Sequence, residues 1–177
     1  MRKAKRMRVY VPGTLPLLRA WYAERSVVPA GIAHTLTPAL REWFAEADTE
    51  ELEYAAMVSA GEDSLRLLAG EDAAPRRRVV IAVDASLAIT DVGPGLPASA
   101  VRLPGPLGWA SVASVHIDEP DSEPVIRAAA AAIRAADAGD EQAQLVVDEA
   151  EACDLLWFDV SEVAAVVADA DSPHPSG

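Results

Sequence analysis

The sequence predicts an α+β domain, with a mixed β-sheet of about five to six strands and helices packed on it. Two fully apolar runs, at residues 79–83 and 155–158, have the pattern of strands that are covered on both faces. Longer segments around them carry apolar residues at helical spacing. The predicted elements neither alternate strictly nor form two separate halves, which favours α+β over a regular α/β fold.

The first element is a strand that turns sharply into a helix. Residues 8–11 read as a short strand that Pro12 and Gly13 end, and Thr14 is placed to cap a helix beginning at Leu15. The apolar positions of this helix continue to near Arg25. We expect the strand to lie inside the sheet, beside the strand at 155–158.

The next hundred residues alternate between regular and irregular segments. Residues 31–36 predict a short strand, and Thr37 before a proline predicts a helix start. Asp48 and Glu51 have the spacing of a capping box, which opens a helix that ends near Gly70. Its expected buried face is Tyr54, Val58, Gly61, Leu65 and Leu68, and its expected solvent face is Glu50, Glu53, Glu62 and Asp63.

The second half contains the remaining predicted strands. The arginines at 76–78 are expected to flank the strand at 79–83 as a solvated edge. Residues 85–108 predict a loop with a short strand at 99–103, and residues 104–108 are expected to close a hairpin into a strand at 109–118. Helices follow at about 126–136, 143–150 and 163–167, the last opened by a second capping box.

Composition limits the classes of function. The 177 residues suit one domain, and a net charge of −13 disfavours binding to a phosphate backbone. The single cysteine, Cys153, excludes an internal disulfide and a cysteine-rich zinc site, and suits a reducing compartment. No run approaches the ~18 apolar residues of a membrane span. We therefore expect a cytoplasmic protein without cofactor, metal, nucleic acid or membrane, comprising a basic extension (1–6), one domain (7–168) and a disordered tail (169–177).

One predicted strand face carries three polar residues with catalytic chemistry. Ser114, His116 and Asp118 alternate along the strand at 109–118. Alternate strand residues lie roughly 6.6–6.8 Å apart along the chain, whereas catalytic hydrogen bonds need about 2.6–3.2 Å. We therefore interpret them as a polar, half-exposed face, with a His116–Asp118 metal half-site as the alternative. His34 reads as a core histidine, although it could converge with His116 across the sheet.

Two further features invite a binding interpretation. The turn Pro12, Gly13 and Thr14 precedes a helix N-terminus, which can bind an anion, but the single glycine without a following lysine falls short of a phosphate-binding loop. Trp109 follows a glycine near the expected hairpin turn. Exposed there, it could anchor a protein partner.

Several stretches resemble an uncharacterised family of small actinobacterial proteins, known only as a domain of unknown function. They are Arg-Val-Tyr-Val-Pro-Gly-Thr-Leu at 8–15, Leu-Thr-Pro-Ala-Leu-Arg-Glu-Trp at 36–43, Glu-Leu-Glu-Tyr-Ala-Ala at 51–56 and Leu-Leu-Trp-Phe-Asp-Val-Ser-Glu at 155–162. The resemblance covers roughly residues 7–168. It implies a single bacterial domain, and it carries no catalytic residues over to this chain.

The first functional hypothesis is a non-enzymatic acidic protein that acts through protein contacts, as a regulatory or accessory factor or as a homo-oligomer. The alternatives are a small hydrolase-like or metal-assisted enzyme using His116 and Asp118 with His34, and a sensor of an anion or small molecule at the turn Pro12–Thr14. Convergence of the histidines in one pocket favours the enzyme. An exposed apolar surface favours the partner.

Overall fold

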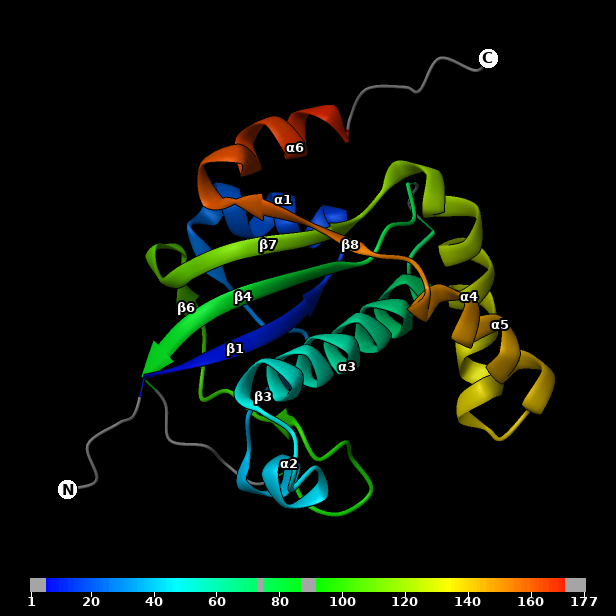
Figure 1. Ribbon diagram of the computed structural model, residues 1–177. Coiled ribbons are helices and arrows are strands. Elements are labelled where there is room, and N and C mark those ends of the chain that lie inside the picture. The colour runs from blue at the N-terminus through cyan, green and yellow to red at the C-terminus, as the bar shows by residue number, and fades with distance from the viewer. Residues whose placement is uncertain (1–5, 73–74, 87–91, 171–177) are drawn as a thin grey trace.

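The computed structural model describes residues 6–72, 75–86 and 92–170. Its centre is a six-stranded sheet with the strand order β5-β3-β1-β4-β7-β8 (Figure 1). Helices pack on this sheet, which confirms the α+β class. Every pairing in the sheet is antiparallel, so the expected mixed sheet is wrong. Within the described residues, no helix is long and apolar enough to cross a membrane.

The strands and helices have the following bounds. The strands are β1 (Arg6–Gly13), β2 (Ser26–Val27), β3 (Ala33–Thr35), β4 (Val79–Ser86), β5 (Ala100–Val101), β6 (Leu107–Gly108), β7 (Val112–Asp118) and β8 (Leu155–Asp159). The helices are α1 (Leu15–Glu24), α2 (Pro38–Trp43), α3 (Thr49–Ala69), α4 (Glu123–Asp137), α5 (Glu141–Glu151) and α6 (Val163–Asp169).

The strands β1 and β4 form the middle of the sheet and pair along their whole length, from Arg6 opposite Ser86 to Gly13 opposite Val79. Successive side chains point to opposite faces of a strand. Val9 and Val11 therefore face one side of the sheet, and Tyr10 faces the other. Both faces are apolar here, as expected for central strands that are covered on both sides.

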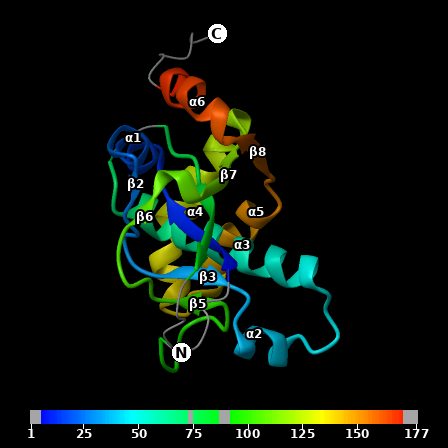
Figure 2. The same cartoon turned by 90° about the vertical axis from the view of Figure 1, so that its left-hand side faces the viewer.

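Helices cover both faces of this sheet (Figure 2). On one face, α1 and α6 bury the larger core, which includes Leu18, Trp21, Ile81, Ile117 and Val163. On the other face, α3 packs its Leu52, Ala56 and Ala60 against Tyr10, Val80 and Ala82. The far end of α3 joins α4 and α5 in a third cluster, which includes Leu65, Leu68, Ile126, Ile133 and Val147.

Local sequence signals determine where several helices begin. The side chains of Thr14, Thr37 and Asp48 cap α1, α2 and α3 as predicted. The capping boxes at Asp48 and Asp159 are both present. Helix α4 buries the stripe that its sequence predicts: Ile126, Ala129, Ala130, Ile133 and Ala136.

The buried face of α3 differs from the prediction. Tyr54 is 61% exposed, whereas Leu52, Ala56 and Ala60 are buried. The helix packs on the sheet along one stripe and on α4 along another, so its buried surface is wider than a single amphipathic face. The solvent-facing role expected for Asp63 is also wrong, because that side chain contacts His34.

The pairing of the later strands also differs from the prediction. Strand β8 is the edge strand beside β7, so its expected position next to β1 is wrong. The expected hairpin does not form, because β5 pairs with β3 and β6 pairs with β2. Residues 109–111 form a 3₁₀ helix rather than part of a strand. The long loop lets residues 100–101 reach the opposite edge of the sheet, and local spacing does not encode that crossing.

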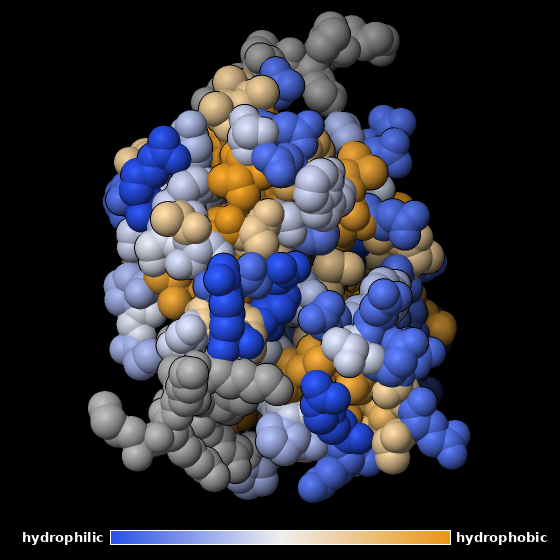
Figure 3. Space-filling model, turned by 60° about the vertical axis from the view of Figure 1, so that its left-hand side comes forward, coloured by the Kyte–Doolittle hydropathy of each residue, from blue (hydrophilic) through white to orange (hydrophobic). Residues whose placement is uncertain are grey.

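The basic residues at the start of the chain are partly tied to the sheet. Arg6 is the first residue of β1, and residues 1–5 and 171–177 of the expected extension and tail lie outside the described residues. Arg8 donates two hydrogen bonds to Asp84, and this pair lowers the pKa of the carboxyl. Figure 3 shows the adjoining face of the molecule, where hydrophilic residues surround small separate hydrophobic patches.

The close packing of Gly13 on Trp21 gives a test of the core. A Cβ atom at position 13 would lie 2.9 Å from Cζ3 of Trp21, whose ring is buried. We expect Gly13→Ala to lower the free energy of unfolding by about 1–3 kcal/mol, measured by urea denaturation. Gly108→Ala is the matched control, because nothing lies within 4 Å of its Cβ position. Equal stability of the two variants would contradict this packing.

Candidate functional site

The predicted catalytic residues of β7 do not act as one group. Ser114 Oγ lies 3.0 Å from His116 Nε2, so the two side chains bridge the separation of their backbones, and the expectation that spacing keeps them apart is wrong. Burial, and then the charge of Arg8, lowers the pKa of His116. Asp118 accepts hydrogen bonds from Arg78 instead of His116. The side chain of Ser114 is buried. The structure therefore contains a Ser114–His116 pair that Asp118 does not orient.

Asp118 forms a buried ion pair with Arg78, at the point where β4 begins and β7 ends. The Arg78 side chain donates from Nη2 to Oδ1 at 2.7 Å and from Nε to Oδ2 at 3.0 Å. The Arg78 backbone N–H also donates to Oδ2, at 2.6 Å. Both side chains are buried, so the expected solvated edge at 76–78 is wrong for Arg78. The carboxylate of Asp118 is thereby committed to the fold and not to a metal half-site with His116.

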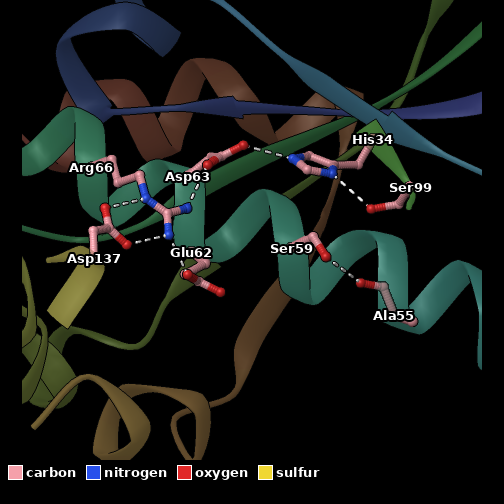
Figure 4. Close-up of polar contacts among 8 residues, drawn as sticks. All are labelled: His34, Ala55, Ser59, Glu62, Asp63, Arg66, Ser99 and Asp137. Carbon is pink, nitrogen blue, oxygen red and sulfur yellow. Dashed lines mark hydrogen bonds and ion pairs between the residues drawn. The ribbon is translucent and has the colours of Figure 1, made fainter. Parts of the chain in front are cut away.

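His34 lies inside a hydrogen-bonded chain that begins at Ser99 (Figure 4). Its Nδ1 is 2.8 Å from Ser99 Oγ, and its Nε2 is 2.7 Å from Asp63 Oδ2. A carboxylate only accepts hydrogen bonds. The Nε2 of His34 therefore donates to Asp63, and its Nδ1 shares a hydrogen bond with the hydroxyl of Ser99.

The chain continues from Asp63 to the surface through Arg66. Arg66 donates to Asp63 Oδ1 at 2.7 Å, to both carboxylate oxygens of Asp137 on α4, and to Glu62. Burial alone would raise the pKa of Asp63, but the hydrogen bonds and charges of His34 and Arg66 outweigh it and lower that pKa. The network thus joins β3, α3 and α4 through charged groups.

This order of serine, histidine and carboxylate is that of a nucleophilic triad, but its nucleophile is enclosed. Ser99 and His34 are 1% and 0% exposed. A serine nucleophile must reach a reacting carbonyl, and Ser99 has almost no surface for that contact. We interpret the hydrogen-bonded network of Ser99, His34, Asp63 and Arg66 as a structural contact that holds the short strand β3 against α3, and we call it the polar lock.

The histidines do not converge. Tyr10 stands opposite His34 in the sheet and opposite Ala82 on its other side, and Ala82 stands opposite Ser114. Strands β1 and β4 therefore separate His34 from the strand of His116. With neighbouring strands about 4.8 Å apart, β3 and β7 are roughly 14 Å apart.

In the turn Pro12–Thr14, the side chain of Thr14 binds the carboxyl group of Glu71. Thr14 Oγ1 donates to Glu71 Oε1 at 2.8 Å and accepts from the backbone N–H of Leu17. Thr14 is fully buried, and Gly13 packs against Trp21. The Glu71 carboxylate thus lies beside the N-terminus of α1, where the sensor hypothesis would place an anion.

The structure exchanges the expected roles of two tryptophans. Trp109 is 7% exposed and packs edge-on against Tyr22, with ring centroids 5.4 Å apart, so it lacks the exposure that a partner anchor needs. Trp157, expected in an interior strand, is 60% exposed on the edge strand β8. Both segments are apolar in sequence, and the deciding fact is which strand ends the sheet. Nothing local in the sequence gives that order.

Metal chemistry gains no support from the described residues. Among residues 6–72, 75–86 and 92–170, no three His, Cys, Asp or Glu side chains lie close enough to hold a metal ion.

Comparison with known proteins gives a family and no activity. Residues 7–167 match the model of a family of unknown function, DUF6912. The chain belongs to this family. No curated protein and no solved structure matches the chain. A function for this DUF6912 member therefore has to be argued from its own surface and cavities.

Asp63 gives a test of the polar lock. We expect Asp63→Asn to lower the free energy of unfolding by about 1–3 kcal/mol at pH 7, because His34 and Arg66 lose a charged acceptor. The folded-state pKa of Asp63 is lowered, so this contribution is complete above about pH 5 and is lost as the pH falls through that pKa. Urea denaturation from pH 7 to 3 should show the two proteins converging. Glu62→Gln, which changes a more exposed partner of Arg66, should change stability by about 0.5 kcal/mol or less.

Asp118 gives a second test, because its removal leaves a buried charge. We expect Asp118→Asn to cost about 3–5 kcal/mol in thermal or urea unfolding. Asp84→Asn breaks the comparable ion pair with Arg8 near the surface and should cost about 1 kcal/mol or less. Similar losses for both variants would contradict the buried character of the Arg78–Asp118 pair.

Proposed function

We propose that this protein is a non-enzymatic cytoplasmic factor that binds a protein partner through the outer edge of β8. The observation that supports the proposal is the 60% exposed side chain of Trp157 on an edge strand. Large aromatic side chains are among the commonest anchors of protein interfaces. A second exposed aromatic side chain, Tyr54 of α3, is 61% exposed, and α3 lies on the face of the sheet to which Trp157 points.

The backbone of β8 is available for pairing. Among the strands of the described residues, β7 alone pairs with it. The sequence of β8, Leu-Leu-Trp-Phe-Asp, contains no proline or lysine, the residues that commonly protect an edge strand. At the end of the strand, the backbone N–H of Asp159 donates to the carboxylate of Glu162. An extended segment of a partner can therefore add a seventh strand beside β8.

The charge of the chain indicates the chemistry of that segment. Acidic residues lie at both ends of β8: Glu151 and Asp154 precede it, Asp159 is its last residue, and Glu162 follows it. The whole chain carries a net charge of −13. A strand with apolar residues on alternate positions and lysines or arginines at its ends complements this edge. A second copy would bring two acidic edges together, which favours a different protein as the partner.

Two exposed tryptophans provide a matched test. Trp157 lies on β8 and Trp43, 78% exposed, lies at the end of α2. We expect the full-length chain, tagged and cross-linked in its native host, to capture a partner that Trp43→Ser retains. Trp157→Ser should reduce its recovery at least tenfold. Hydrogen exchange of the purified complex should then slow at the amides of residues 155–159.

Three results would contradict the proposal. The first is equal recovery of the partner by both serine variants, and the second is hydrogen-exchange protection confined to elements other than β8. The third is a dimer of the purified wild-type chain in light scattering that Trp157→Ser dissociates. The last result would assign the edge to a second copy of the chain.

A further inference from the structure

A cavity of about 190 Å³ lies where α3, α5 and the start of β8 meet. Most of its wall is apolar, contributed by Met57, Val58, Leu65, Val147, Ala150 and Leu155. An engineered apolar cavity of about 150 Å³ binds benzene. The space therefore suits a molecule with a single aromatic ring or a short branched chain.

The wall contains one buried cationic group with a free donor. Arg78 lines the cavity, and its Nε and Nη2 are committed to Asp118 and to the carbonyl of Cys153. Its Nη1 has no hydrogen-bond partner among the described residues. Nη1 is not one of the fully buried polar atoms that lack a partner, so it is open to the cavity, where the acceptor of a bound molecule can replace water.

A glycine in the middle of α3 opens the space in front of this donor. Gly61 also lines the cavity, and an added Cβ atom there would lie 3.7 Å from Nη1 of Arg78 and 3.9 Å from Leu155. These are ordinary contacts, so the fold would accept alanine at this position. Glycine is a much poorer helix former than alanine. Packing therefore does not require a glycine at position 61. The glycine leaves Nη1 of Arg78 accessible from the cavity.

We propose that this cavity binds a small neutral molecule with an apolar body and one hydrogen-bond acceptor, a ketone or an amide, which accepts from Nη1 of Arg78. Asp118 already balances the charge of Arg78. Glu62, Glu151 and Asp154 also line the cavity, and their negative charges disfavour an anion. An acceptor without charge satisfies Nη1 at the lowest electrostatic cost. Tyr54 and Leu155 also line this cavity, so it adjoins the proposed partner surface, but binding of a small molecule there does not depend on a partner.

The single cysteine of the chain reports occupancy directly. Cys153 lines the cavity, so a bound molecule should slow its alkylation by N-ethylmaleimide. Acetophenone and benzamide are the neutral acceptor probes, benzoate is the charged comparator, and toluene is the comparator without an acceptor. Amide NMR shifts of Gly61 and Cys153 give a second readout. We expect saturable shifts and slower alkylation with the two acceptor probes, and at least fivefold weaker binding of benzoate and toluene.

The decisive variant is Gly61→Ala, which places a methyl group against Nη1. We expect it to raise the denaturation midpoint and to weaken acetophenone and benzamide at least fivefold. Ser59→Ala is the matched control, since it also introduces alanine into α3 but lies outside the cavity wall. It should leave the affinities unchanged. Absence of saturable binding by both acceptor probes, equal binding of benzoate, or unchanged affinity in Gly61→Ala would each overturn the proposal.

Discussion

Both faces of the molecule depend on the antiparallel pairing of β1 with β4 over the whole of both strands. The two segments are separated by some 65 residues of chain, from Gly13 to Val79, and their register decides which side chains meet on each face. A slip of β4 by one residue against β1 would turn Ile81 and Val83 toward α3 and Val80 and Ala82 toward α1. The two helical layers recognise different faces, so only one register buries both cores.

Two buried polar pairs hold elements that the apolar cores leave undetermined. The Arg78–Asp118 pair joins the beginning of β4 to the end of β7, and Arg78 also reaches the carbonyl of Cys153 just before β8. The His34–Asp63 pair ties a three-residue strand to α3. Burying charged groups is costly unless each finds its partner, so these contacts penalise alternative arrangements more than they add stability.

The positions of the polar side chains limit where a ligand or partner can bind. The side chains of His34, Ser99, Asp118 and Thr14 are buried, and their partners are other residues of the chain. What remains open is an edge strand with an exposed tryptophan and an apolar cavity with one free donor. The first has the surface chemistry of a protein interface, and the second has the size and polarity of a small-molecule site.

Features that arise from interactions within a few residues could be predicted from the sequence. Capping at Thr14, Asp48 and Asp159, the buried stripe of α4 and the apolar centre of β4 follow from spacing and residue type, because the interactions are local. Strand order, the crossing of the loop to β3, and the partners of Asp63 and Arg78 were decided only by the tertiary structure. Trp109 and Trp157 show the reason most clearly. Both lie in apolar segments of the sequence. Whether each is buried depends on whether another element, far away in sequence, covers it.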